Sequence, residues 1–299
     1  MGETVFFGYD RAALDREYDN GGKVANAAEH IARYSVESAR ARDTLPARLD
    51  LRYGPAPGEA LDLFLAEGGG PAPVHVFVHG GYWRALGKVD FSFVARAFQP
   101  GGALVAVIDY ALIPTVDMDE LVRQARASLA WLYRNAAAFG GDPGRITVSG
   151  HSAGGHLVAM LMSTDWPRFA GLPADVVKAG CGISGLYDLE PIRLCYLNDT
   201  LGLTAEMARR NSPVHVVPAA AGGPLLLPVG GLEGGEYHRQ TESLAAAWRR
   251  RGLAAEVMDM PGHDHFSIIA ELGDPGTPLS RAILRQMGLA PSAPARAAR

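Results

Sequence analysis

Residues 146–155 read Ile146-Thr147-Val148-Ser149-Gly150-His151-Ser152-Ala153-Gly154-Gly155. The apolar run at 145–149 predicts a buried strand, and residues 153–163 predict the helix that follows it. Between them lies a Gly-x-Ser-x-Gly pattern, whose small residues allow a turn tight enough to expose the serine above a sheet. A glycine-rich turn with a purely structural role could have the same sequence pattern. The position of this pattern between a strand and a helix nevertheless makes Ser152 a candidate nucleophile.

Short apolar runs alternate with longer amphipathic segments on both sides of this stretch. The alternation predicts an α/β fold in which helices link buried parallel strands. Upstream, alternating runs at 49–53 and 60–65 predict a hairpin at a sheet edge, and residues 10–43 predict two helices interrupted at Asn20-Gly21-Gly22. The predicted strands are 74–78, 103–108, 145–149, 177–182, 225–230 and 254–259. The predicted helices are 88–98, 118–138, 153–163, 236–251, 266–272 and 279–287, before residues 291–299 fray.

The composition excludes several classes of protein. The 299 residues carry 28 Lys+Arg, 32 Asp+Glu and 48% hydrophobic residues, which is typical of a soluble globular chain, here expected as one domain over 1–299. Without a basic run, neither nucleic acid nor a membrane surface is an expected partner. The chain shows no long apolar stretch and no signal-peptide pattern, and Cys181 and Cys195 read as reduced thiols, so we expect a cytoplasmic protein.

A second glycine-rich segment follows the predicted strand 74–78 and reads His79-Gly80-Gly81-Tyr82-Trp83. Reactive groups gather on loops at the carboxyl ends of parallel strands, and a His-Gly-Gly loop can aim backbone N–H groups at an oxyanion. We therefore expect the N–H groups of Gly81, Tyr82 and Ala153 to form an oxyanion hole. The alternative is a glycine-rich turn whose buried His79 only bonds to the backbone.

Two further loops offer an acid and a base in the expected chain order. Glu233 lies on the loop after strand 225–230, whereas Glu236 opens the next helix, where a carboxylate has an ordinary stabilising role. His263 and His265 both follow strand 254–259; we favour His265 because an apolar helical start follows it directly. A His-x-His metal pair is the other interpretation, but no HExxH motif or Cys/His cluster accompanies it.

These residues predict nucleophilic catalysis on an acyl group. His265 would take the proton of Ser152 during attack on a carbonyl, Glu233 would fix the imidazole tautomer, and water would hydrolyse the acyl-enzyme. The expected partner is a small-molecule acyl amide or ester, and the scheme requires no metal or organic cofactor.

Four segments resemble the arylformamidase (kynurenine formamidase) branch of the α/β-hydrolase fold, a likeness that runs from about residue 10 to residue 273. They are 79–83 (HGGYW), 150–155 (GHSAGG), 184–189 (SGLYDL) and 236–240 (EYHRQ). The resemblance implies a mostly parallel eight-stranded sheet with helices on both faces, and hydrolysis of N-formyl-L-kynurenine to formate and kynurenine. It also implies an acid at Glu233 and a histidine at His265. The acid is commonly Asp in animal members, so Glu233 is a departure.

The expected pocket follows from this substrate. Tyr82 and Trp83 would narrow the acyl site and offer aromatic faces to an aryl leaving group, and Tyr187 would join them. The alternative for Trp83 is packing beneath the loop. Segments 10–43 and 185–215 would cap the active site.

Three functions compete at this point: an arylformamidase-like amidase, a short-chain carboxylesterase of broad specificity, and a binding protein that has lost catalysis. The complete set of Ser152, Glu233 and His265 argues against the third. Fold and triad fix acyl transfer but not the acyl donor, so the sequence does not separate the first two. A monomer and a homodimer are both compatible with the sequence.

Overall fold

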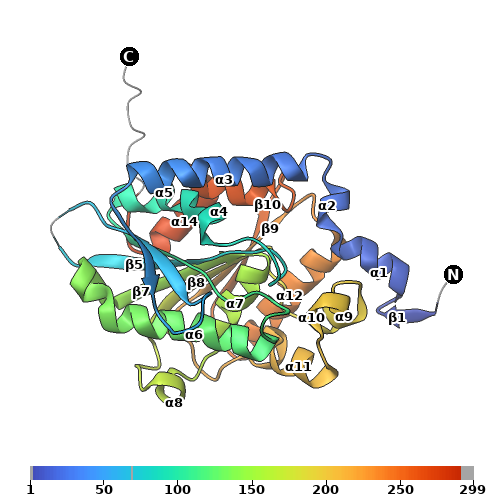
Figure 1. Cartoon of the computed structure of the whole chain (residues 1–299). Helices are drawn as coiled ribbons and strands as arrows, with labels where there is room; N and C mark the ends of the chain where they lie inside the picture. The colour runs from blue at the N-terminus through green and yellow to red at the C-terminus, as the bar shows by residue number, and fades with distance from the viewer. Residues whose placement is uncertain (1–2, 69, 291–299) are drawn as a thin grey trace.

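One eight-stranded sheet forms the centre of the computed structural model, which describes residues 3–68 and 70–290 (Figure 1). The tail at 291–299, where fraying is predicted, lies outside the described residues. In spatial order, the strands are β10 (Ala255–Met260), β9 (Leu225–Gly230), β8 (Val177–Ile183), β7 (Gly141–His151), β5 (Ala72–Val78), β6 (Leu104–Ile108), β4 (Ala60–Phe64) and β3 (Ala47–Arg52).

Six neighbouring strands, from β10 to β6, run parallel, whereas β4 is antiparallel to β6 and β3 to β4. The mostly parallel eight-stranded sheet and its edge hairpin are therefore confirmed. A separate two-stranded ribbon joins β1 (Thr4–Phe6) and β2 (Tyr9–Asp10).

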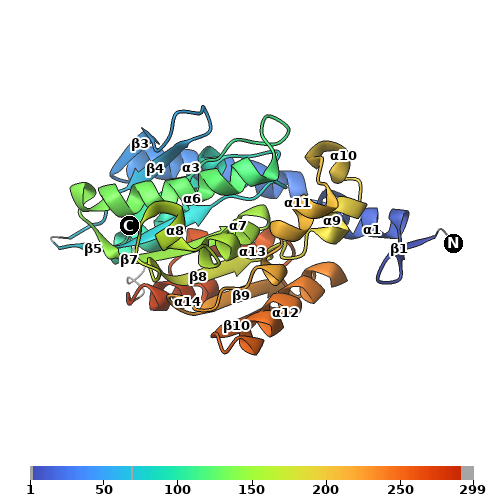
Figure 2. The ribbon, with the colours of Figure 1, turned by 90° about the horizontal axis from the view of Figure 1, so that it is seen from below.

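Helices cover both faces of the sheet (Figures 1 and 2). They are α1 (Arg11–Tyr18), α2 (Asn20–Lys23), α3 (Ala27–Thr44), α4 (Lys88–Phe91), α5 (Ala95–Phe98), α6 (Met118–Asn135), α7 (Ala153–Met162), α8 (Trp166–Ala170), α9 (Glu190–Leu194), α10 (Asn198–Leu201), α11 (Ala205–Arg210), α12 (Gly235–Arg250), α13 (Ser267–Ala270) and α14 (Pro278–Gln286). Short 3₁₀ turns lie at Ser92–Val94, Gln99–Gly101, Ala136–Phe139, Pro213–His215 and Glu271–Gly273.

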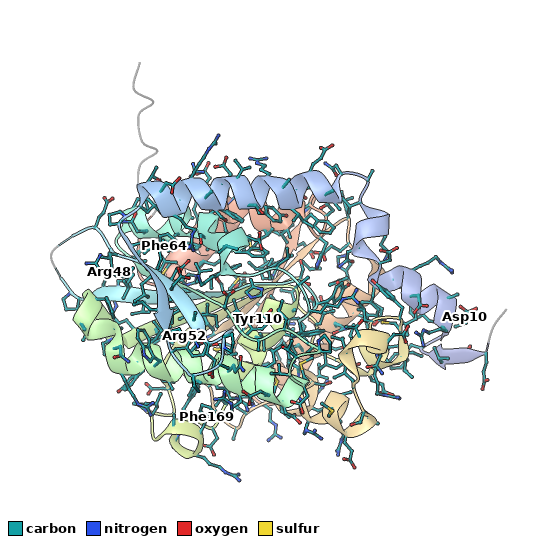
Figure 3. The ribbon with its side chains drawn as sticks, in the orientation of Figure 1. Asp10, Arg48, Arg52, Phe64, Tyr110 and Phe169 are labelled. Atoms are coloured by element: carbon teal, nitrogen blue, oxygen red, sulfur yellow. The ribbon has the colours of Figure 1, made fainter. Side chains whose placement is uncertain are left out.

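The period of two along each buried strand divides the interior into two cores. On β5, Val76 and Val78 pack with α6, α7 and α12 on one face of the sheet. Phe77 points to the other face and packs with residues of α4, α5, α13 and α14. Phe64 lies in this second core, while Phe169 sits at the surface on the outlying α8 (Figure 3).

The helices depart from the prediction in several places. Helices α8, α9, α10 and α11 were not predicted, and two predicted regions differ in detail. The segment 88–98 divides into α4, a 3₁₀ turn and α5, and the Ser92 hydroxyl bonds back to Lys88 O (2.9 Å) where the helix breaks. The Asn20-Gly21-Gly22 interruption is itself the short helix α2, whose Gly22 N–H is capped by the Asp19 carboxylate (3.0 Å). Within the described part of the chain, no helix combines the length and apolarity that crossing a membrane would need.

Candidate active site

Ser152 sits on a strained turn between the end of β7 and the start of α7. Its backbone adopts φ 57° and ψ −118°, a region that costs a non-glycine residue about 1–3 kcal/mol. The chain passes so close to itself here that a Cβ on Gly154 would lie 2.0 Å from Val78 O, and one on Gly150 would lie 2.5 Å from Gly154 O. The two glycines of the Gly-x-Ser-x-Gly pattern thus permit the turn that presents Ser152.

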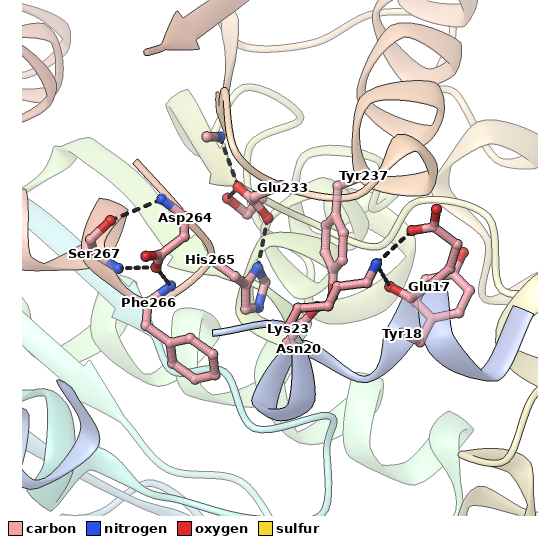
Figure 4. A network of polar contacts seen from close by, with 12 residues as sticks. Glu17, Tyr18, Asn20, Lys23, Glu233, Tyr237, Asp264, His265, Phe266 and Ser267 are labelled. Atoms are coloured by element: carbon pink, nitrogen blue, oxygen red, sulfur yellow. Dashed lines mark hydrogen bonds and ion pairs between the residues drawn. The ribbon is translucent and has the colours of Figure 1, made fainter. Parts of the chain in front are cut away.

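Glu233 and His265 form a hydrogen-bonded pair, with His265 Nδ1 2.7 Å from Glu233 Oε2 (Figure 4). The other carboxylate oxygen accepts from Gly230 N (2.7 Å) and from the Ser184 hydroxyl (2.5 Å). The Glu233 side chain is fully buried, so these three donors compensate its desolvation. An Nδ1–H that donates to the carboxylate leaves the lone pair on Nε2, which is the tautomer that a general base requires.

The neighbouring candidates lie in other surroundings. His263 Nε2 is 3.7 Å from Glu271 Oε1, so the two histidines of the His-x-His pattern face different carboxylates. Glu236 accepts from the Tyr18 hydroxyl (2.8 Å) and from Arg239. No cluster of three or more His, Cys, Asp or Glu side chains suited to a metal ion occurs in residues 3–68 and 70–290.

The glycine-rich loop after β5 makes a left-handed turn. Gly81 has φ 106°, and a Cβ there would lie 2.0 Å from Ala85 O. The N–H groups of Arg84 and Ala85 close the turn on Gly81 O, each at 3.0 Å. Within the described chain, the N–H groups of Gly81, Tyr82 and Ala153 form no hydrogen bond to a protein acceptor. These three groups are available to a ligand oxygen.

His79 is buried beneath this loop. Its Nδ1 donates to Gly80 O (2.8 Å), and its ring stacks on Tyr110 at 4.2 Å between centroids. Burial lowers the pKa of His79. The Tyr110 hydroxyl, in the interior of the molecule in Figure 3, donates to His79 O (2.9 Å). His79 thus bonds to the backbone, as the alternative interpretation expected. The N–H groups of Gly81 and Tyr82 in the same loop are nevertheless available to bind a ligand oxygen.

One cavity of about 290 Å³ contains both Ser152 and His265 in its wall. The glycine-rich loop after β5 contributes Gly81 and Tyr82. The N-terminal helices contribute four residues and the segment after β8 one: Asn20, Gly21, Ile31, Tyr34 and Tyr196. The rest of the wall is formed by Arg84, Ala85, Leu86, Phe91, His151 and Phe266. The cavity is small and mostly apolar, as expected for a ligand pocket.

Two expected pocket residues, Trp83 and Tyr187, do not line this cavity, and the prediction for them is wrong. Both are fully buried. The Trp83 indole N–H points inward to His156 Nδ1 (3.2 Å), so Trp83 packs beneath the loop. The Tyr187 hydroxyl donates to Gly182 O (2.7 Å), where it braces the end of β8.

Several residues of the site carried no predicted role. Ser184 holds Glu233, and the Tyr237 ring packs on the His265 imidazole at 4.7 Å between centroids (Figure 4). Asn20 donates to the hydroxyls of Tyr82 (3.0 Å) and Tyr237 (2.7 Å). Ser184 and Tyr237 belong to the family-like segments 184–189 and 236–240, so the sequence marked these segments but did not indicate what the two residues do. Asn20 was marked only as part of an interruption between two predicted helices.

His151 is the last residue of β7 and directly precedes Ser152, and its ring centroid lies 4.6 Å from that of His265. Burial, and secondarily the proximity of His265, hold the pKa of His151 well below its usual value. The neighbouring imidazole is therefore neutral near pH 7 and places no positive charge against His265.

Comparisons with known proteins give a consistent result. The BD-FAE family model matches residues 61–171. The chain is 34% identical over 264 residues to a kynurenine formamidase of Danio rerio, covering 87% of this chain and 88% of that protein. It is 42% identical over 90 residues, 30% of this chain and 28% of the other, to a carboxylesterase of Mycobacterium tuberculosis. A solved structure from Silicibacter sp. TM1040 superposes with a TM-score of 0.79 at 33% identity, over 89% of this chain and 97% of that one.

Proposed function

Because this chain belongs to the kynurenine formamidase family of α/β-hydrolases, and is thus a hydrolase, we propose that it removes a formyl group from an aryl amide such as N-formyl-L-kynurenine. The observation that carries the proposal is that His265, paired with Glu233 at 2.7 Å, lines the same small cavity as Ser152 and the glycine-rich loop after β5.

The proposed reaction proceeds in two steps. His265 Nε2 removes the proton of Ser152 as Oγ attacks the formyl carbon, and the N–H groups of Gly81, Tyr82 and Ala153 bind the oxyanion. His265 then returns the proton to the departing aryl amine, which leaves a formyl ester on Ser152. In the second step, His265 takes a proton from water, whose oxygen attacks the ester and releases formate and the Ser152 hydroxyl. Glu233 stabilises the imidazolium in both steps.

The surroundings of the pocket support a small acyl group. Tyr82 is held by Asn20 and by the Tyr18 carbonyl (2.7 Å), so it has little freedom to move away from the acyl site. In the proposed enzyme, the N-terminal helices and residues 185–215 form a cap, a role that the pocket residues of α2, α3 and Tyr196 support. Two unpaired, buried cysteines support a reducing compartment such as the cytoplasm.

Ser152→Ala tests the nucleophile. We expect this variant to release no measurable kynurenine from N-formyl-L-kynurenine. Its circular dichroism spectrum and melting temperature should equal those of the parent protein. Retained turnover would refute the role of Ser152.

The similarity to a carboxylesterase over 90 residues supports a second candidate, a short-chain esterase that uses the same triad. The test compares kcat/KM for N-formyl-L-kynurenine with the values for p-nitrophenyl acetate and butyrate. The formamidase proposal expects the formamide to exceed both esters. A preference for butyrate by orders of magnitude would replace that proposal with the esterase.

A further inference from the structure

Arg84 is the one residue of fixed charge among the described residues that line the cavity, and no Asp or Glu joins it there. It lies two residues after Tyr82, on the same left-handed turn that carries the oxyanion N–H groups. A cation in a mostly apolar wall attracts an anionic group more strongly than it would in open water, because the surroundings are less polarisable.

The guanidinium is held in place by few contacts within the protein. Its Nη1 donates to the Thr200 hydroxyl (3.1 Å) on α10, and its carbon lies 5.9 Å from the centre of the Tyr196 ring. A guanidinium has five N–H donors, and no carboxylate of the described chain lies within ion-pair distance of this one. The group is therefore oriented by a hydroxyl and an aromatic face, with donors to spare.

Two carboxylates near Tyr196 are engaged elsewhere. Asp15 Oδ1 accepts from the Tyr196 backbone N–H (2.7 Å), and Asp19 Oδ1 accepts from the Gly22 N–H (3.0 Å). Neither forms an ion pair with Arg84, so the positive charge of this wall is not neutralised by the protein's own acids.

We infer that Arg84 binds a carboxylate on the leaving-group part of the substrate, so that the enzyme selects aryl formamides whose side chain carries a carboxylate. This inference rests on the proposed function, because it takes the formyl group to lie at Ser152 and the rest of the molecule to extend along the cavity. Guanidinium and carboxylate match in shape, and their hydrogen bonds are charge-assisted. Arg84 would then determine specificity without taking part in the bond-breaking steps.

The test compares two substrates that share the aryl formamide and the ortho ketone. N-formyl-L-kynurenine carries a carboxylate, and 2′-formamidoacetophenone does not. The readout is the ratio of kcat/KM for the first to kcat/KM for the second, in which general effects of a mutation on catalysis cancel. In Arg84→Gln we expect this ratio to fall about 10- to 100-fold, mainly through KM for N-formyl-L-kynurenine. Arg84→Lys should retain part of the ratio.

Arg126→Gln is the matched control. Arg126 also donates to a threonine hydroxyl, that of Thr164 (3.0 Å), and also lies 5.9 Å from an aromatic ring, that of Phe169, but it does not line the cavity. The parent ratio should persist in this variant. An unchanged ratio in Arg84→Gln, or an equal loss in Arg126→Gln, would overturn the inference.

Failure of the proposed function is recognised separately. If the parent enzyme cleaves p-nitrophenyl esters but neither formamide, the formamidase proposal fails and the role of Arg84 is read from inhibition of ester hydrolysis. L-kynurenine should then inhibit more strongly than 2′-aminoacetophenone, and Arg84→Gln should remove the difference. Equal inhibition of the parent enzyme by both compounds would reject the carboxylate site as well.

Discussion

At the scale of single residues, the hydrogen bonds of Glu233 determine which acidic side chain fits at this position. Three donors share its two oxygens: the Gly230 N–H, the Ser184 hydroxyl and the His265 imidazole. A side chain one methylene shorter starts from the same backbone and falls short of at least one of these donors. The glutamate thus fits the length of this loop, although aspartate is the common acid of the animal family members that the sequence resembles.

Substitution of Glu233 tests this fit. Glu233→Asp should lower kcat about 10- to 100-fold, the equivalent of one charge-assisted hydrogen bond. Glu233→Gln should lower it by about 10³–10⁴, because an amide N–H favours the wrong imidazole tautomer. Steady-state kinetics on N-formyl-L-kynurenine measures both, with Glu242→Gln, exposed on α12, as the control. Full activity in Glu233→Gln would exclude this residue as the acid.

In the proposed mechanism Ser184 is a positioning residue, because its hydroxyl donates to Glu233, which in turn holds His265. Ser184→Ala should lower kcat about tenfold with little change in KM, since one hydrogen bond to a buried charge is lost. Ser163→Ala is a matched control, because the Ser163 hydroxyl is buried without a partner among the described residues. A rise in KM at constant kcat in Ser184→Ala would indicate a role in substrate binding instead.

The prediction that Trp83 lines the pocket failed for a local reason. Tyr82 and Trp83 both adopt positive φ angles, 47° and 58°, in the turn after β5. Within this left-handed turn, Tyr82 and Arg84 line the cavity, whereas Trp83 faces the interior. Residue types alone favoured the aromatic side chain and gave no indication of the turn geometry.

At the scale of elements, short apolar runs predicted the inner strands well because strands such as β5, β6 and β9 are buried on both faces. The ends of β8, β9 and β10 agree with the sequence prediction to within one residue, and β7 begins four residues early, at Gly141. The helices were less predictable where tertiary contacts override local preference. Two glycines make α2 a poor helix by propensity, yet it forms because Asn20 is held by tyrosines from distant parts of the chain.

Asn20 is therefore expected to hold the N-terminal helices over the site. Asn20→Ala removes two hydrogen bonds and should lower the free energy of unfolding by about 1–3 kcal/mol. It should also raise KM, because Gly21 and Tyr82 line the cavity beside it. Urea unfolding and steady-state kinetics measure the two effects. Asn26→Ala is the control, since Asn26 is exposed and makes no capping hydrogen bond. A change in stability without a change in KM would restrict Asn20 to a structural role.

At the scale of the whole molecule, the interior contains titratable histidines as well as apolar side chains. His75 lies inside it between the Thr147 and Ser149 hydroxyls, at 3.0 and 2.7 Å, and His156 bridges Trp83 to Asn211 O. Burial lowers the pKa of His75 to about 3 and that of His156 to about 4. Both are neutral in the folded protein at pH 5, and His79 and His151 are shifted in the same direction.

These buried histidines predict a sensitivity to mild acid. An unfolded histidine has a pKa near 6.5, so below that pH the unfolded chain binds protons that the folded chain does not. The contribution of each neutral, buried histidine to the free energy of unfolding is fully present above pH 6.5. It is lost as the pH falls toward 4 for His156 and toward 3 for His75. Each such histidine contributes a slope of up to about 1.4 kcal/mol per pH unit in the free energy of unfolding.

Urea unfolding between pH 6.5 and 5 measures this slope, in a range where most carboxylates are still ionised. His156→Gln changes the stability at every pH, but its slope should be smaller than that of the parent by the share of one histidine, because glutamine does not titrate. The comparison of slopes separates protonation from the loss of packing. Equal slopes in the two proteins, or a parent stability that is flat over this range, would show that His156 takes up its proton without unfolding.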